Sequence, residues 1–189
     1  MINLCAVLLN KACKILTRLV QFFYPMPQNK ELRDLAIREK VRIRKSTDAD
    51  FNFIISSWLK TYKYSGPHVR KMLDRIYYEA YEPIVKDLIK RSDIYVACLR
   101  EDPDVIVGYL ALERSQDKDV IHFCLIKDLW QKMGVATYLA HAAQPKEITY
   151  FTHWTNPIES IVNKIPYLYQ PFLISGALNE TKVRNSAAG

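Results

Sequence analysis

The chain has 189 residues, of which 49% are hydrophobic and 12% aromatic, which is enough apolar surface for one domain with a sizeable core. A formal net charge of +7 favours an anionic partner, without choosing among nucleic acid, a membrane surface and a phosphate-bearing cofactor. The four cysteines (Cys5, Cys13, Cys98 and Cys124) show neither a CxxC pair nor zinc-ligand spacing. This pattern argues against structural disulfides and zinc and favours a reducing, cytoplasmic setting.

Residues 1–25 are predicted to form a basic amphipathic helix, since polar residues fall within one third of a helical wheel and apolar residues fill the rest. Through residues 2–23 such a helix could lie on a membrane, pack on the domain, or contact a partner or a second copy of the chain. Lys11, Lys14 and Arg18 interrupt the apolar run too often for a transmembrane span, and no signal-peptide pattern is present.

The remainder divides into a charged linker or short helix at 26–40, a domain over 41–175 and a flexible polar tail at 176–189. Translation from Met26 is a further alternative, because everything that reads as the domain follows it. There is no internal repeat and no low-complexity segment, so a single globular unit is expected.

The domain is predicted to begin with a strand over 41–46, where apolar and polar residues alternate. Thr47 then provides an N-cap, and Asp50 three residues later completes a capping box. A helix is expected over 51–62, because apolar residues recur there at helical spacing.

A second, longer helix is predicted from about His68 to Lys90, with a break or kink at Pro83. Three extended runs follow, separated by short polar tips that are rich in turn residues. The economical interpretation is an antiparallel meander, with strands over Ile94–Arg100, Val105–Arg114 and Asp119–Ile126.

The last part of the domain is predicted to alternate helices and strands. A helix is expected within 129–143 and a strand over 147–154. Asn156 as N-cap and Pro157 at the first helical position predict another helix, before a final strand over 167–174. The resulting element order is β-α-α-β-β-β-α-β-α-β.

The segment Gln131-Lys132-Met133-Gly134-Val135-Ala136 lies between the predicted fourth strand and the third helix and matches the motif Q/R-x-x-G-x-G/A. The element order and this motif together resemble those of the GNAT (GCN5-related N-acetyltransferase) superfamily. The resemblance covers about Val41 to Ser175. Gly108 resembles a glycine that is frequent on that family's third strand. The resemblance implies an α/β (α+β) GNAT acyl-CoA N-acyltransferase fold, with a mixed, mostly antiparallel sheet flanked by helices.

The motif has a physical rationale as an anion site, because the first amides of a helix lack intrahelical partners and the helix dipole favours negative charge there. The resemblance implies acetyl-CoA as cofactor, with the pyrophosphate of coenzyme A at the glycine turn and the pantetheine arm along the end of the fourth strand. The residues so implied are Gln131, Lys132, Met133, Gly134, Val135 and Ala136 at the turn, Cys124, Leu125 and Ile126 on the strand, and Asn156 beyond the fifth strand.

The chain departs from the family where many members carry a glutamate general base on the fourth strand, since this strand offers only His122 near its middle. His122 and His153 are candidate bases because an unperturbed imidazole titrates near neutral pH. Strand alternation would place His122 away from the substrate. Glu159, Tyr167 and Tyr169 are further acid–base candidates, although a first-turn helix acid and aromatic packing explain them equally well.

Three functions are compatible with these observations. The first is a GNAT N-acetyltransferase that transfers acetyl from acetyl-CoA to a primary amine by direct attack, since no cysteine occupies a convincing nucleophile position. The second is a nucleic-acid-associated or DNA-base-modifying enzyme, suggested by the basic charge, the cations and aromatics between Trp58 and Tyr81, and a likeness to small GNAT-like bacteriophage proteins. The third is a non-catalytic GNAT-fold protein that binds coenzyme A or a partner.

Overall fold

The computed structural model of the protein describes residues 30–116 and 118–176. The predicted helix at 1–25 and all but the first residue of the predicted tail at 176–189 lie outside the described residues. Within those residues, no helix combines the length and the apolar character that crossing a membrane requires.

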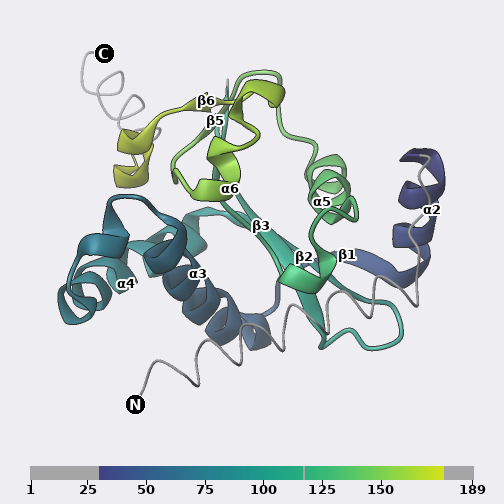
Figure 1. Ribbon diagram of the computed structural model, residues 1–189, viewed down its shortest axis with the longest axis horizontal. Helices are drawn as coiled ribbons and strands as arrows, with labels where there is room; N and C mark the ends of the chain where they lie inside the picture. Colours follow the sequence, from purple (N-terminus) through teal and green to yellow (C-terminus); the bar gives the residue numbers. More distant parts are fainter. Residues whose placement is uncertain (1–29, 117, 177–189) are drawn as a thin grey trace, which may run out of the picture.

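A six-stranded sheet with the strands in sequence order forms the centre of the fold (Figure 1). The first four strands pair antiparallel, which confirms the predicted meander, whereas β5 pairs parallel with β4 and β6 pairs parallel with β5. The strands are β1 (Val41–Lys45), β2 (Asp93–Leu99), β3 (Ile106–Arg114), β4 (Asp119–Ile126), β5 (Thr149–Phe151) and β6 (Leu168–Tyr169).

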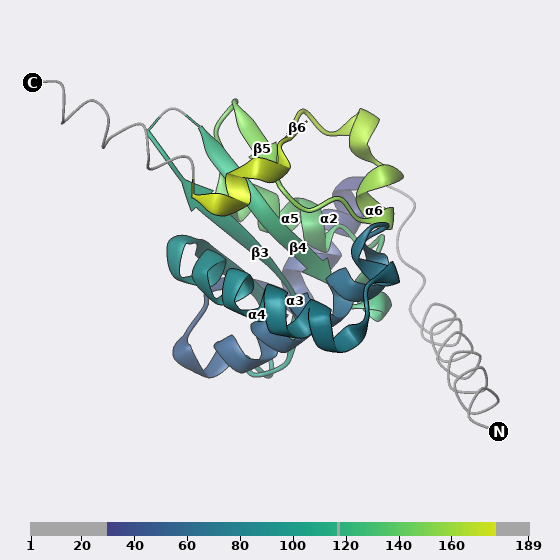
Figure 2. The ribbon, with the colours of Figure 1, turned by 90° about the vertical axis from the view of Figure 1, so that its left-hand side faces the viewer.

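Helices cover both faces of this sheet (Figure 2). On one face, α3 (Phe51–Ser65) and α4 (Asp74–Arg91) bury an aromatic core that includes Trp58, Tyr77 and Phe123. On the other face, α5 (Val135–Ala143) and α2 (Lys30–Lys40) pack over a mainly aliphatic core. The segment predicted as a linker or short helix is therefore partly helix α2, and Ile37 within it is 1% exposed.

The second long helix begins later than predicted, at Asp74 instead of His68. Residues 69–71 form only a 3-10 turn, because the buried Lys63 ammonium binds the carbonyls of Val69, Arg70 and Met72 at 3.2, 3.2 and 2.7 Å. Lys63 also meets the Asp74 carboxylate at 3.2 Å. Pro83 lies inside α4 and does not end it.

The C-terminal elements are shorter than their sequence patterns suggest. The strand predicted over 147–154 pairs only at β5, and the last one only at β6, after which Pro171 opens a 3-10 segment (Pro171–Ser175) because proline cannot donate to a strand ladder. Thr155, in extended conformation, is the N-cap of α6 (Asn156–Glu159), and Asn156 is its first residue instead of its cap.

Strand β4 has a bulge at His122. Ala111 pairs with Phe123 and Leu112 pairs with Ile121, so His122 has no partner residue on β3. A bulge re-aims the side chains on either side of it, and both His122 and Phe123 project toward α3 and α4, where they meet Glu113 and Trp58. The alternation that would have turned His122 away from this face is therefore broken at this residue.

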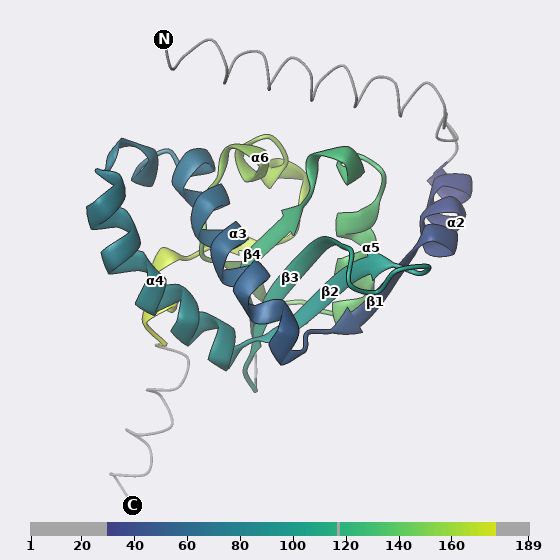
Figure 3. The same cartoon turned by 90° about the horizontal axis from the view of Figure 1, so that it is seen from below.

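The neighbouring strand β5 separates from β4 at the same level. The last paired residues are Ile121 and Phe151, and Thr152 donates its backbone N–H to Ile121 O at 3.2 Å. Beyond that bond, no strand of the described residues covers the β5-side edge of β4. Figure 3 shows β4 beside β3, with which it stays paired as far as Ile126.

Replacing Lys63 with methionine should destabilise the fold by about 3 kcal/mol, because the carbonyls of Val69, Arg70 and Met72 and the Asp74 carboxylate would lose their donor. Urea unfolding monitored by tryptophan fluorescence measures this change. The matched control is Lys60→Met on an exposed position of the same helix, which should stay within about 0.5 kcal/mol of the wild type. Equal stability of the two variants would contradict a structural role for the Lys63 ammonium.

Candidate active site

The glycine turn before α5 has the backbone shape of an anion site. Gly134 adopts φ 92°, a left-handed conformation that favours glycine, and Lys132 adopts φ 64°. Tyr138 is the first residue of α5 to donate its N–H into the helix, to Gly134 O at 2.9 Å. The amides before it therefore lack intrahelical partners and are available to an anion.

The side chain of Gln131 closes this turn against the end of β4. Its Nε2 donates to Ile126 O at 3.1 Å and to the Asp128 carboxylate at 2.9 Å. The first residue of the motif thus makes internal contacts that fix the turn. Lys127 and Lys132 are exposed lysines of the same segment and supply positive charge there.

The uncovered edge of β4 leads directly into the turn. Lys127 donates its N–H to Val107 O at 2.9 Å, which fixes the alternation of backbone groups along the antiparallel pair. By this alternation Cys124 and Ile126 direct their backbone N–H and C=O groups away from β3, toward the edge that β5 has left. Apart from Ile126 O, which accepts from Gln131, these groups have no hydrogen-bond partner within residues 30–116 and 118–176.

A buried cluster of aromatic side chains surrounds His153, which follows β5. Ring centroids of Tyr62, Trp58 and Phe123 lie 4.7, 5.4 and 5.7 Å from the imidazole centroid. Tyr81 on α4 meets the ring at its edge, with Oη 2.7 Å from Nε2. Helices α3 and α4 thus place a phenol hydroxyl and an imidazole in contact, close to where β4 and β5 separate.

A chain of hydrogen bonds continues from His153 into the core. His153 Nδ1 lies 2.8 Å from Thr152 Oγ1, which lies 3.1 Å from His122 Nδ1. His122 Nε2 lies 2.8 Å from the Glu113 carboxylate, and Arg91 on α4 forms an ion pair with the same carboxylate. Sequence reasoning proposed the two histidines separately, and the structure joins them through Thr152.

The environment shifts the pKa values of these groups. Burial lowers the pKa of His153 to about 3, with a smaller contribution from His122. Burial also lowers the pKa of His122, although Glu113 opposes the shift, and raises the pKa of Tyr81 far above its usual range. Burial acts to raise the pKa of Glu113, but the hydrogen bond from His122 and the charge of Arg91 hold it below its usual value. At neutral pH both imidazoles are therefore uncharged and Glu113 is ionised.

The other predicted site residues lie at varying distances from this cluster. Tyr169 on β6 is 42% exposed, packs on Trp154 with centroids 5.1 Å apart, and its phenol contributes to the raised pKa values of Tyr62 and Tyr81. Tyr167 is half-buried among aliphatic residues on the α5 face. Asn156 and Glu159 are exposed on α6, and nothing in the geometry joins them to the histidines.

Four polar residues of the cluster were not predicted from the sequence as site residues: Thr152, Glu113, Arg91 and Tyr81. Tyr81 lies in the segment between Trp58 and Tyr81, which attracted attention only for its mixture of aromatic and basic residues. From the sequence, Glu113 would be taken for an exposed polar residue at the end of a strand. It is only 3% exposed, because α4 packs over it in the folded protein. A buried glutamate is therefore present in the sheet, but it lies on β3. The resemblance to the GNAT superfamily had led us to look for a glutamate on the fourth strand.

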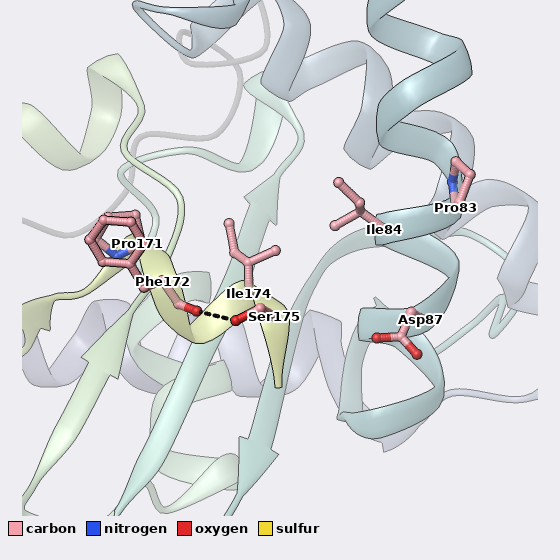
Figure 4. A pocket seen from close by; sticks show the side chains of 7 residues that line it. All are labelled: Pro83, Ile84, Asp87, Pro171, Phe172, Ile174 and Ser175. Atoms are coloured by element: carbon pink, nitrogen blue, oxygen red, sulfur yellow. Dashed lines mark hydrogen bonds between the residues drawn. The ribbon is translucent and has the colours of Figure 1, made fainter. Parts of the chain in front are cut away.

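A shallow groove of about 560 Å³ lies elsewhere, between α4 and residues 171–175 (Figure 4). Its lining is mainly apolar, with Ile84 and Ile174 facing it, and its polar side chains are Asp87 and Ser175. Ser175 Oγ donates to Phe172 O at 2.8 Å. The glycine turn and the open edge of β4 do not contribute to it, so it is not part of the candidate site.

Comparison with known proteins places the fold. No protein-family model matches the chain, and no curated protein matches it in sequence. Among solved structures, a provisionally named acetyl transferase from Pyrococcus furiosus matches with a TM-score of 0.54 and 13% identity, over 66% of this chain and 91% of the other. The structure named histone acetyltransferase HPA2 and related acetyltransferase, from Corynebacterium glutamicum, matches with a TM-score of 0.50 and 16% identity, over 66% and 83%.

The low pKa of His153 makes stability depend on pH. An unfolded histidine binds a proton below about pH 6.5, whereas folded His153 stays neutral down to about pH 3. Stability is therefore lost as pH falls below 6.5, by about 2 kcal/mol at pH 5 from this residue. We expect the loss of unfolding free energy between pH 7 and pH 5, measured in urea, to be smaller by about that amount in His153→Gln. His141→Gln, at an exposed position, should lose as much as the wild type; equal losses in all three proteins would contradict the assignment.

Proposed function

We propose that this chain, which has the GNAT acyltransferase fold, transfers an acetyl group from acetyl-CoA to a primary amine by direct attack. One juxtaposition carries the proposal. The open amides of the Gly134 turn continue into the uncovered edge of β4, and that edge begins beside the buried Tyr81–His153 pair. The turn would bind an anion, the open edge of β4 would bind an extended ligand, and the Tyr81–His153 pair would transfer a proton. These three parts adjoin one another in that order.

The residues present fit coenzyme A. The turn at 132–136 offers unpartnered amides to a pyrophosphate, with Lys132 as a nearby cation, and Gly134 in its left-handed conformation keeps a side chain off the backbone. The open N–H and C=O of Cys124 would pair with the amides of a pantetheine arm. When bound, acetyl-CoA supplies the activated thioester, and the protein supplies position and proton transfer.

Tyr81 and His153 are proposed to accept the proton of the attacking amine. The Tyr81 oxygen would receive it while the phenol proton passes to His153 Nε2, which lies 2.7 Å away. Tyr62, Trp58 and Phe123 surround the imidazole and exclude water. Trp58 Nε1 is a buried donor with no protein acceptor among the described residues, as expected where a polar ligand group enters.

Direct attack is favoured over an acyl-enzyme by the state of the two cysteines among the described residues, Cys98 and Cys124. Cys98 is buried in the sheet. Solvent reaches Cys124, yet the surrounding protein desolvates its thiol and raises its pKa to about 12. A thiol is a good nucleophile only as the thiolate, and the raised pKa lowers the thiolate fraction of Cys124 at neutral pH.

Gly134→Ala should weaken binding of coenzyme A at least about tenfold, because alanine is strained at positive φ and its methyl group partly covers the amides. Isothermal titration calorimetry measures the dissociation constant. Gly176→Ala is the matched control, since Gly176 also has positive φ (83°) but lies after the 3-10 segment 171–175, away from the turn. Unchanged affinity in folded Gly134→Ala would refute the cofactor site.

Tyr81→Phe should lower kcat by about 10²-fold or more and leave coenzyme A affinity unchanged, because it removes the proton acceptor only. Thiol release is measured with a polyamine, an aromatic ethylamine, an alkylamine and an amino sugar as acceptors. Tyr78→Phe, on the same helix, is expected to match the wild type. Binding of coenzyme A without turnover for any amine would instead favour the non-catalytic alternative.

A further inference from the structure

A buried chain of hydrogen bonds runs from Tyr81 to Glu113. Each bond in it has a single proton, so all of the bonds must donate in the same direction along the chain. Its members are Tyr81, His153, Thr152, His122 and Glu113, joined by contacts of 2.7, 2.8, 3.1 and 2.8 Å. The last four are between 1% and 3% exposed. Each neutral imidazole donates through one nitrogen and accepts through the other, and the threonine hydroxyl has a single proton to donate.

Only two arrangements satisfy every link, and the charge of Glu113 decides between them. If Glu113 is a carboxylate, it accepts from His122 Nε2–H, which leaves His122 Nδ1 to accept from Thr152. Thr152 Oγ1 then accepts from His153 Nδ1–H, and His153 Nε2 accepts from the phenol of Tyr81. The opposite arrangement requires a protonated Glu113 that donates to His122.

Arg91 selects the first arrangement. Its guanidinium forms an ion pair with the Glu113 carboxylate and is itself held by Asp87 at 2.9 Å and by Ile174 O at 2.8 Å. This ion pair lies at the Glu113 end of the hydrogen-bond chain, where α4 meets residues 171–175. The same charge lowers the pKa of Glu113, and the lowered pKa of His122 excludes a doubly protonated ring. Thr152 has another acceptor in His122 O, but at 3.5 Å this contact is the weaker one.

We propose that Glu113, paired with Arg91, is a positioning residue that fixes His153 as the Nδ1–H tautomer through His122 and Thr152, and thereby directs the Tyr81 proton inward. This inference rests on the proposed function for its catalytic consequence. With its proton engaged by His153, the phenol oxygen can only accept, from the Tyr62 hydroxyl beside it or from the acceptor amine.

The same orientation defines where the amine proton goes. One proton moves from the amine to Tyr81 Oη, one from Tyr81 to His153 Nε2, one from His153 Nδ1 to Thr152 and one from Thr152 to His122 Nδ1. The last moves from His122 Nε2 to Glu113. The net result is an uncharged Glu113 with no buried imidazolium, which the low pKa of His153 disfavours.

The test is the tautomer of His153, read from the nitrogen signals of ¹⁵N-histidine-labelled protein, in which only four histidines contribute. We expect a protonated Nδ1 and an unprotonated Nε2 in the wild type and in Thr152→Ser, which keeps the hydroxyl. Thr152→Val and Glu113→Gln should lose this single tautomer. A wild-type His153 protonated on Nε2, or a Thr152→Val variant with the wild-type pattern, would overturn the proposal.

Kinetics test the consequence independently. In mixtures of H₂O and D₂O, kcat of the wild type should depend on the deuterium fraction along a curve, as when several protons move, and the dependence should become linear in Thr152→Val. kcat should fall about 10²-fold in Thr152→Val and stay within about threefold in Thr152→Ser. A linear dependence in the wild type would overturn the route to Glu113. Absence of turnover in the wild type would overturn the proposed function alone, since the nitrogen signals report the tautomer without turnover.

Discussion

The separation of β5 from β4 is the constraint on which the candidate site depends. Strand pairing supplies partners for backbone groups on both edges of β4 up to Ile121, and the N–H of Thr152 makes the last such bond. Beyond it, β4 must either be solvated or bind another extended chain. An edge of this kind is unusual in the middle of a sheet, and here it continues into the N-terminus of α5, whose first amides also lack intrahelical partners.

The bulge at His122 acts together with this separation. The extra residue in β4 reverses the alternation of its backbone N–H and C=O groups. Before the bulge, odd-numbered residues direct these groups toward β5; after the bulge, even-numbered residues direct them toward the open edge. The same shift turns His122 toward α3 and α4, where it reaches both Glu113 and Thr152. The separation of β5 leaves backbone groups of β4 unpaired, and the bulge decides which residues carry them and buries the imidazole that links the polar chain.

The polar chain is enclosed by apolar and aromatic packing, which raises the cost of any missing partner. Buried polar networks stabilise a fold only if every member is satisfied. Here each imidazole nitrogen has a partner, and the charge at the inner end is balanced by Arg91, which also ties residues near 174 to α4. The stability of the fold and the proposed proton transfer thus depend on the same contacts. Lys63 serves a separate purpose, because it holds the turn that precedes α4.

The elements and their order could be predicted from local sequence signals, because hydrophobic period, caps and glycine placement are properties of short segments. The motif around Gly134 could be recognised for the same reason, and the structure has the expected fold. Residues whose role depends on distant partners could not be identified: Glu113 and Arg91 are 22 positions apart. The helix predicted from His68 failed because Lys63 takes the carbonyls that it would have used.

How the candidate residues combine depends on contacts between distant segments, which local patterns do not contain. His122 and His153 are 31 positions apart, and period-two alternation placed the first on the wrong face, because a bulge in one strand is set by its pairing with another. Tyr81 became part of the site through the packing of α4 against the end of β5. Local sequence fixes which groups are available, whereas the hydrogen-bond partners of buried groups are chosen by the packing that removes water from them.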